Sequence, residues 1–291
     1  MLAEMKKGKP MDFGAYFNAA LTDPECGFYT TADPFNREGH FITSPEISPI
    51  FGELMAVFVQ LFWGQNGMDS AEHPKVIAEL GPGTGALARE VLRSIWSFGC
   101  AENLEYVFVE VSPKLATVQQ KTINEFFISR GLMLEFADSE GVETLRCGEK
   151  KLCFRWVRDL GGLASVVGAR DGPCRPFVLA HEFFDALPAQ KFRFSSGRWR
   201  ELLIEPNPTA RIGGTKVFDI VPGPSDSPSV KNILRPEIRF ASPPPENTEI
   251  EVSPVSLFHM DLINSLCDAH KGASLIIDYG EKHAFTDSLI V

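Results

Sequence analysis

The sequence has no long apolar run, no closely spaced cysteine pair and little positive charge. No apolar segment approaches the roughly 20 residues that span a bilayer, so we expect no integral membrane segment. The six cysteines form no C-x-x-C pair, so their spacing indicates neither a metal site nor a disulfide framework. With 28 basic against 38 acidic residues, the chain lacks the basic surface that nucleic acids require, and a cationic partner suits it better.

Length and composition indicate a globular protein with one large core. The chain has 291 residues, of which 44% are hydrophobic and 23% charged. Residues 1–10 contain three lysines and no arginine, and they are too short for a signal or transit peptide. We predict one elaborated domain over 1–291, with N-terminal helices and an active-site loop in 1–74. Its core is predicted at 75–188 and 255–291, with an insertion at 189–254.

The N-terminal region shows two helical patterns separated by a loop. Apolar spacing predicts a helix with Asp12 as its N-cap, ending near Asp23. Residues 24–48 are rich in Pro, Gly, Thr and Ser, and so long a loop is often functional. A second helix is predicted from about Pro49, with a broad apolar stripe of the kind that packs on a core. That stripe consists of Ile50, Leu54, Val57, Phe58, Leu61 and Phe62.

Beyond residue 75, short apolar strands alternate with helices, which predicts an α/β fold with a parallel sheet. The predicted strands are 76–78, 106–109, 132–136, 152–157, 177–180 and 275–277, and the predicted helices are 86–96, 113–129 and 255–267. The insertion has a different texture, with alternating aromatic residues and proline-rich stretches, and is predicted to be antiparallel.

A glycine turn follows the first of these strands directly. Glycines at positions 81, 83 and 85 allow a tight turn and let a ligand approach the backbone. The same residues satisfy a relaxed dinucleotide pattern, which is weak evidence by itself. Close packing of helix on strand is the alternative without a ligand. The turn therefore predicts a ligand site but does not choose the ligand.

Three acidic residues near strand ends narrow the choice of ligand. Glu79 would repel a pyrophosphate and attract the ammonium group of a methionine moiety. Glu110 is placed to accept ribose hydroxyls, in a nicotinamide or an S-adenosylmethionine site alike. Asp159 either accepts a hydrogen bond from an adenine amino group or is a solvated loop acid. Together they favour S-adenosylmethionine as cofactor.

A second polar group follows the strand at 177–180. Glu182 and Asp185, beside two phenylalanines, would come to the carboxyl edge of the sheet, where open α/β folds bind ligands. Two carboxylates suit a guanidinium group, so we predict Glu182 and Asp185 as catalytic residues acting on arginine. The alternative is that they cap a following helix. His181 is either a base or a structural residue, and the role of Asp278 is open.

The order of the motifs resembles that of the MidA family, which comprises mitochondrial complex I assembly methyltransferases and bacterial relatives. The resemblance implies a Rossmann-like class I methyltransferase sheet with S-adenosyl-L-methionine as cofactor. It also implies symmetric dimethylation of an arginine in a complex I subunit of the 49 kDa type, in the mitochondrial matrix or, alternatively, in a bacterial cytoplasm. The motifs are the stretches 27–31, 39–48, 51–53, 79–85, 182–188 and 278–280.

The same resemblance assigns residues to the cofactor. Glu79 and the three glycines of the turn would bind it, and Thr43 and Glu46 would close over it. Two departures stand out: the family usually has Asp where this chain has His40, and family members continue well beyond residue 277. We therefore expect the C-terminal strands of the family's sheet to be missing.

Three functions remain open from the sequence. The first is an active protein arginine methyltransferase. The second is a factor that binds the same cofactor and assists respiratory complex assembly without catalysis. The third, a nicotinamide-dependent oxidoreductase, is disfavoured by Glu79 and by the lack of a recognisable hydride-transfer site.

Overall fold

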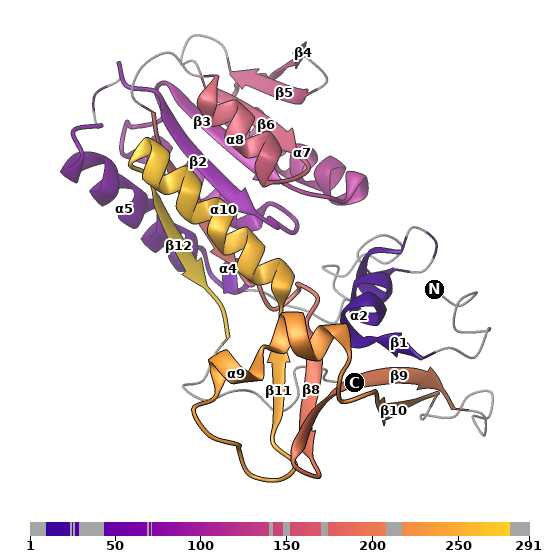
Figure 1. Ribbon diagram of the computed structural model, residues 1–291. Helices are drawn as coiled ribbons and strands as arrows, with labels where there is room; N and C mark the ends of the chain where they lie inside the picture. The colour runs from indigo at the N-terminus through magenta and orange to yellow at the C-terminus, as the bar shows by residue number, and fades with distance from the viewer. Residues whose placement is uncertain are drawn as a thin grey trace. The chain divides into compact units, whose positions relative to one another are not determined.

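A computed structural model describes residues 10–23, 25, 27, 28, 44–68, 70, 72–139, 142–147, 152–169, 174–207 and 217–279. The chain forms two compact units. The parallel-sheet unit comprises residues 32–184 and 259–278, and the antiparallel-sheet unit comprises 1–31, 185–258 and 279–291. Figure 1 labels the elements of both. The organisation as one elaborated domain stays a prediction.

The parallel-sheet unit contains a seven-stranded sheet in the order β12-β7-β2-β3-β6-β5-β4. Neighbouring strands from β12 to β6 are parallel, whereas β5 pairs antiparallel with both β6 and β4. The strands are β2 (Lys75–Leu80), β3 (Leu104–Val109), β4 (Glu135–Ser139), β5 (Val142–Cys147), β6 (Leu152–Val157), β7 (Arg175–His181) and β12 (Ala273–Ile277). The predicted parallel sheet is confirmed. β5 is not among the predicted strands, and β4 begins later than predicted.

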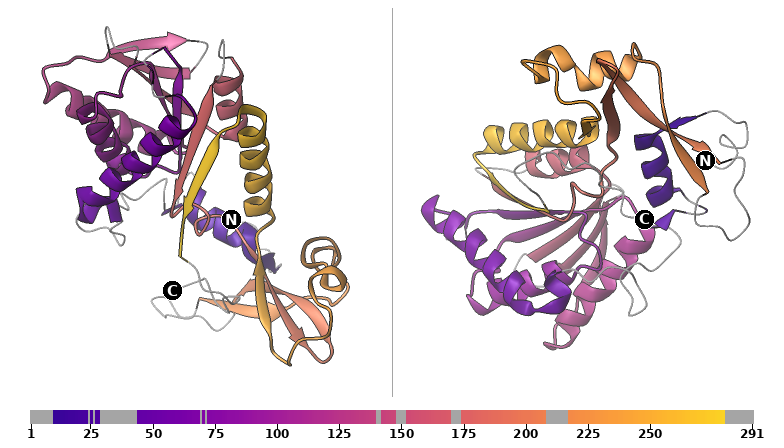
Figure 2. Two further views of the ribbon diagram at one scale, coloured as in Figure 1. Left: turned by 90° about the vertical axis from the view of Figure 1, so that its left-hand side faces the viewer. Right: turned by 90° about the horizontal axis from the view of Figure 1, so that it is seen from below.

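Helices cover both faces of this sheet (Figure 2). Alternate residues of β2 show the division, since Ile77 packs with α5, α6 and α7, while Val76 and Ala78 pack with α8 and α10. The helices are α4 (Ser44–Ile47), α5 (Pro49–Gln65), α6 (Ala86–Ser97), α7 (Pro113–Ile128), α8 (Leu160–Gly168) and α10 (Pro254–His270). All except α4 and α8 are predicted from the sequence.

The buried face of α5 differs from the predicted one. Ile50, Leu54, Val57, Phe58 and Leu61 are each between 41% and 61% exposed, so the predicted stripe is wrong for these residues. The buried face consists of Gly52, Met55, Ala56, Val59 and Trp63. The helix carries a single charged residue, so hydrophobic periodicity does not distinguish its two faces.

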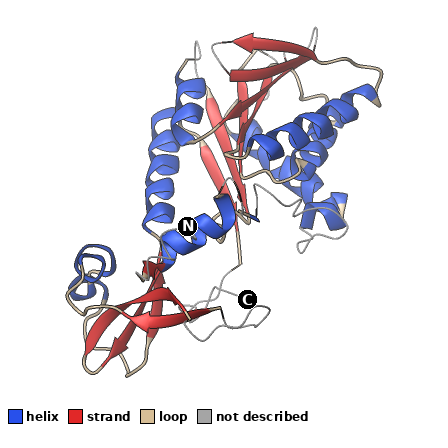
Figure 3. Cartoon of the chain, turned by 90° about the vertical axis from the view of Figure 1, so that its right-hand side faces the viewer, coloured by secondary structure: helices blue, strands red, loops and turns tan. Residues whose placement is uncertain are grey.

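The antiparallel-sheet unit contains a five-stranded sheet in which β1, β8 and β10 all pair with β9, and β11 pairs with β8. Its elements are β1 (Met11–Asp12), α2 (Phe13–Thr22), β8 (Gln190–Ser195), β9 (Arg198–Pro206), β10 (Phe218–Pro222), η2 (Val230–Leu234), α9 (Pro236–Arg239) and β11 (Glu249–Val252). The antiparallel insertion is therefore confirmed, and β1 extends it from the N-terminal region. Figure 3 shows the strands in red.

The first helix begins as its sequence predicts. Asp12 has an extended backbone, and its Oδ1 accepts a hydrogen bond from the backbone N–H of Ala15 at 2.8 Å. The helix α2 that follows ends at Thr22, beside the predicted end at Asp23. A local capping signal thus located this element, although its packing partner, β9, lies nearly 200 residues further along the chain.

Candidate functional site

The glycine turn connects β2 to α6 in a conformation that requires glycine. Gly81, Gly83 and Gly85 have φ values of 59°, 53° and 79°, a region that side chains with a Cβ rarely adopt. A Cβ on Gly81 would also lie 2.9 Å from Cδ2 of Phe183. The backbone N–H of Gly81 donates to the carbonyl of Val109 at 3.1 Å, which ties the turn to β3. The predicted turn is therefore present and tightly held.

Glu79 lies at the end of β2, on the face of the sheet that α5, α6 and α7 cover. Its side chain is buried, and its Oε2 accepts a hydrogen bond from the Tyr106 hydroxyl at 2.5 Å. Burial raises the pKa of Glu79 to about 8, an effect that the bond from Tyr106 only partly opposes. Near neutral pH the carboxyl group is therefore mostly protonated until a cation approaches it.

Glu110 follows β3, and both of its carboxylate oxygens are bonded from the protein side. Oε1 accepts from the backbone N–H of Ser112 at 2.8 Å, and Oε2 accepts from Nε2 of Gln119 at 3.0 Å. Burial raises the pKa of Glu110, and the bonds from Ser112 and Gln119 oppose that rise. The carboxyl group is thus held in one orientation beside the glycine turn.

Two residues of α7 connect that helix to the turn, and sequence reasoning missed both. Gln119 donates from Nε2 to the carbonyl of Gly83 at 2.8 Å, and its Oε1 accepts from the indole N–H of Trp156 at 3.0 Å. The Thr122 hydroxyl donates to the carbonyl of Thr84 at 2.9 Å. The available signal was a polar residue, Gln119, on an otherwise apolar helix face that also carries Leu115, Ile123 and Phe126.

Asp159 has a structural role that explains its position. It is the N-cap of α8, and its Oδ1 accepts from the backbone N–H of Gly162 at 2.8 Å. Its side chain is exposed at the carboxyl end of β6. A contact between Asp159 and an adenine group stays a prediction.

The end of β7 brings a second group of polar side chains together. Glu182 has a φ of 50°, and its Oε1 lies 3.4 Å from Nε2 of His181. The carboxylate of Asp278, after β12, accepts from the backbone N–H of Phe184 at 3.0 Å. Burial lowers the pKa of His181, while Glu182 and Asp278 oppose that change. We call His181, Glu182 and Asp278 the strand-end cluster.

No helix follows the strand-end cluster in the described residues 182–189, which lead into β8. The alternative that Glu182 and Asp185 cap a following helix is therefore wrong. Asp185 is exposed and belongs to the antiparallel-sheet unit, whereas Glu182 belongs to the parallel-sheet unit. Their joint action on one substrate stays a prediction.

Two further predicted residues fall outside the described part of the chain. Thr43 lies outside the described residues, as does the side chain of Glu46, although the backbone of Glu46 is part of α4. Their predicted contact with the cofactor stays a prediction.

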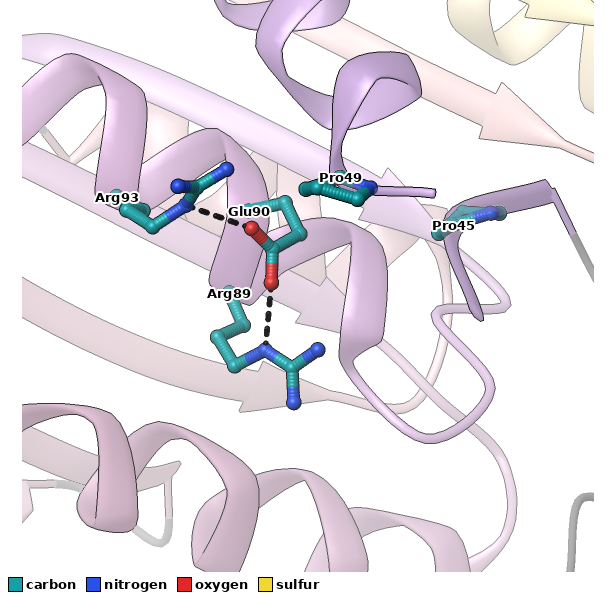
Figure 4. A pocket seen from close by; sticks show the side chains of 5 residues that line it. All are labelled: Pro45, Pro49, Arg89, Glu90 and Arg93. Atoms are coloured by element: carbon teal, nitrogen blue, oxygen red, sulfur yellow. Dashed lines mark hydrogen bonds and ion pairs between the residues drawn. The ribbon is translucent and has the colours of Figure 1, made fainter. Parts of the chain in front are cut away.

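A hollow of about 330 Å³ lies between α4, α5 and α6, away from the glycine turn (Figure 4). It is lined by Pro45, Pro49, Arg89, Glu90 and Arg93, none of which is a predicted site residue. The charges pair with one another, because Glu90 lies 2.9 Å from Nε of Arg89 and 2.7 Å from Nε of Arg93. These contacts hold α5 and α6 together and suggest no ligand.

The motif at 51–53 serves the same packing. A Cβ on Gly52 would lie 2.4 Å from Cβ of Glu90, so only glycine permits this approach of α5 to α6. Glu53 pairs with Arg93 at 2.6 Å. Two residues of a motif that suggested function by resemblance therefore have a structural explanation.

Within the described ranges, no group of three or more His, Cys, Asp or Glu side chains could hold a metal ion. None of the described helices is both long enough and apolar enough to cross a membrane.

Comparisons with known proteins agree with this geometry. A family model for S-adenosyl-L-methionine-dependent methyltransferases matches residues 54–290. Two curated relatives are the "Protein arginine methyltransferase NDUFAF7 homolog, mitochondrial" of Drosophila melanogaster and the "Protein arginine methyltransferase NDUFAF7, mitochondrial" of Rattus norvegicus. The first is 35% identical over 96% of this chain and 59% of its own length, and the second is 32% identical over 99% and 61%. The chain thus spans about three fifths of the length of these relatives.

Solved structures show the same fold. A Burkholderia thailandensis protein crystallised with S-adenosyl-homocysteine superposes with a TM-score of 0.62 at 19% identity, covering 91% of this chain and 57% of that protein. A native crystal structure from the same organism gives a TM-score of 0.60 at 18% identity. At this level of identity the likeness concerns the fold alone.

Proposed function

The chain belongs to the family of S-adenosyl-L-methionine-dependent methyltransferases, and we propose that it binds this cofactor at the glycine turn and methylates an arginine side chain of a protein. The observation that carries the proposal is the family match over residues 54–290, which contains the turn and Glu110. The arginine acceptor is inferred from the names of the curated relatives and from the acidic residues beyond β7.

The residues at the end of β2 and β3 fit the cofactor. The turn from Gly81 to Gly85 leaves a cradle that any Cβ would fill, which suits a ligand that lies against the backbone. The carboxylate of Glu110 is oriented to accept ribose hydroxyls. When bound, S-adenosylmethionine supplies a methyl group on a positively charged sulfur.

Glu79 would recognise the amino group of the cofactor's methionine part. A cation beside the buried carboxyl group favours its ionised form, so binding lowers a pKa that starts at about 8. Cofactor binding near neutral pH is therefore accompanied by release of a proton from Glu79. The same requirement disfavours a pyrophosphate ligand, which would keep Glu79 protonated.

Glu182 would hold the acceptor. Its carboxylate can pair with a guanidinium group, which is planar and always charged. The carboxylate also favours departure of the proton that the attacked nitrogen loses. Asp185 supplies a second carboxylate in the same stretch of chain, and we propose that both act on the arginine.

The substrate and the compartment follow from the relatives. We propose symmetric dimethylation of an arginine in a complex I subunit of the 49 kDa type during assembly, in the mitochondrial matrix. The names of the curated relatives support an arginine acceptor and a mitochondrial location. A nucleic acid partner is not expected at a formal net charge of -10.

Calorimetric titration of the purified chain with S-adenosylmethionine and with NADH tests the cofactor. We expect binding of the first only, and at least a tenfold loss of affinity in Glu110→Ala, because a buried acceptor of ribose hydroxyls is removed. Glu102→Ala is the matched control, since Glu102 is an exposed acid before the opposite end of β3. Stronger binding of NADH would contradict the proposal.

A transfer assay tests the activity. The chain is incubated with methyl-labelled cofactor and a recombinant complex I subunit of the 49 kDa type, and the labelled protein is hydrolysed for amino acid analysis. Symmetric dimethylarginine is the expected product. Cofactor binding without any transfer would instead support a non-catalytic assembly factor.

A further inference from the structure

Gln119 occupies a central place beside the candidate cofactor site, and its orientation follows from chemistry. Its side chain is fully buried on α7. The indole N–H of Trp156 can only donate, so the atom that faces it at 3.0 Å must be the amide oxygen of Gln119. The amide nitrogen therefore faces the other way, toward the carbonyl of Gly83 and the carboxylate of Glu110.

The amide nitrogen of Gln119 joins two parts of the site. It has two hydrogens, and two acceptors lie within bonding distance: the carbonyl of Gly83 at 2.8 Å and Oε2 of Glu110 at 3.0 Å. All three polar contacts of the side chain are thus used, with no alternative rotation of the amide group available. The glycine turn and the carboxylate are held in a fixed relation through one side chain.

We propose that Gln119 is a positioning residue that holds the Glu110 carboxylate at the orientation required to bind the two ribose hydroxyls of an adenine nucleoside ligand. The proposal rests on the proposed function, because it takes Glu110 as the ribose acceptor. Gln119 itself touches no ligand in this scheme. Its effect on binding is therefore expressed only through the hydroxyls that Glu110 accepts.

Glu110 needs such a partner because it is buried. A carboxylate with one oxygen left without its donor would turn toward another one, and the ribose hydroxyls would then meet it in an unsuitable geometry. Ser112 holds Oε1 from the backbone, at 2.8 Å. Only the bond from Gln119 holds Oε2 from a side chain among the described hydrogen bonds.

The test pairs Gln119→Met with a ligand that lacks the hydroxyls. Methionine keeps the length of the side chain and removes its polar atoms. Affinities are measured by calorimetry for S-adenosylhomocysteine and for its 2′,3′-dideoxy analogue. We expect Gln119→Met to lower the affinity for S-adenosylhomocysteine about tenfold, and to leave the affinity for the dideoxy analogue within twofold of the unaltered chain.

Thr122→Val is the matched control on the same helix. Thr122 bonds the same turn, at the carbonyl of Thr84, but it does not contact Glu110 in the described hydrogen bonds. Any loss of affinity in Thr122→Val should therefore be equal for the two ligands. A selective loss for the hydroxylated ligand in this control would show that the turn, rather than Glu110, responds to α7.

Trp156→Phe provides a second variant, should Gln119→Met fail to fold. Phenylalanine keeps the stack on Phe108, where the ring centres lie 4.8 Å apart, and removes the N–H that orients Gln119. We expect about a threefold loss for S-adenosylhomocysteine and none for the analogue.

The outcomes separate the proposal from the function on which it rests. Selective loss of affinity for the hydroxylated ligand supports positioning by Gln119. Equal losses for both ligands would overturn it and leave Gln119 as a packing residue. Failure of the unaltered chain to bind S-adenosylhomocysteine would instead overturn the proposed function, and with it the ligand that the inference assumes.

Discussion

Two strand-end regions of the parallel-sheet unit differ in how firmly their acidic side chains are held. At the end of β2 and β3, Glu79 and Glu110 are deeply buried and hydrogen-bonded to Tyr106 and Gln119. At the end of β7, Glu182 keeps 21% of its side chain exposed and has a left-handed backbone. A rigid end suits a constant ligand such as a cofactor, and a more exposed end suits a group brought by another protein.

The largest expected effect concerns Glu182 and would separate the two regions. In Glu182→Gln we expect methyl transfer to fall about a thousandfold, because the carboxylate that holds the guanidinium and favours proton loss is removed. Affinity for S-adenosylhomocysteine should stay within twofold of the unaltered chain. Initial rates with labelled cofactor, and calorimetry on the same samples, measure the two quantities.

Glu237→Gln is the control for Glu182, since Glu237 is an exposed acid on α9 with no predicted role. It should leave both quantities unchanged. If Glu182→Gln weakened cofactor binding as strongly as it slowed transfer, the two regions would not be functionally distinct.

The second prediction uses the buried carboxyl group of Glu79. Its folded-state pKa of about 8 lies above the ordinary value of 4.5, so the folded chain holds this proton more tightly than the unfolded chain does. The stability that this confers is fully present below pH 4.5 and is lost as pH rises through about 8. Above that pH, folding must bury a charge or retain a proton against the solvent.

Glu79→Gln should therefore gain stability relative to the unaltered chain as pH rises. The glutamine carbonyl can still accept from Tyr106, but it does not ionise. We expect the difference in unfolding free energy between the two chains to grow by about 3 kcal/mol from pH 5 to pH 8 and then to level off. Denaturant unfolding across this range measures it.

Tyr106→Phe sharpens the same test. The hydroxyl of Tyr106 lowers the pKa of Glu79, so its removal should move the pH at which stability is lost to a higher value. A difference between Glu79→Gln and the unaltered chain that is constant with pH would show that Glu79 is ionised in the folded chain.

The sequence predicted the β2 and β3 end better than the β7 end because its signals there are local. Strand, glycine turn and helix are contiguous, and Glu110 follows the next strand directly. The partners of these acids were missed, since Tyr106 and Gln119 lie 27 and 9 residues from the carboxyl groups they bond. Such pairings depend on strand order and helix placement, which no short motif encodes.

Elsewhere the failures also have physical causes. The exposed face of α5 was taken for its buried one because the helix is apolar nearly all around, and small residues at Gly52 and Ala56 decided the contact with α6. The bond from Asp278 to the backbone of Phe184 joins positions 94 residues apart. The sequence marked both positions as polar or aromatic without indicating that they meet.

The smallest expected effect tests whether the β7 end is strained for function. A non-glycine residue at a φ of 50° costs about 1 kcal/mol, which glycine avoids. Glu182→Gly should therefore raise the unfolding free energy by roughly 0.5 to 1 kcal/mol, part of the gain being offset by the greater freedom of glycine in the unfolded chain. Methyl transfer should be lost in the same variant, because the carboxylate is gone.

Ser196→Gly supplies the comparison that gives this result its meaning. Ser196 has a φ of 52° in the turn between β8 and β9, and no functional role is predicted for it. It should gain a similar stability at no cost in transfer, measured by denaturant unfolding and the same rate assay. A gain in Ser196→Gly together with none in Glu182→Gly would mean that contacts of the Glu182 side chain already offset its backbone strain. The β7 end would then be held as firmly as the glycine turn, and the contrast between the two regions would rest on solvent exposure alone.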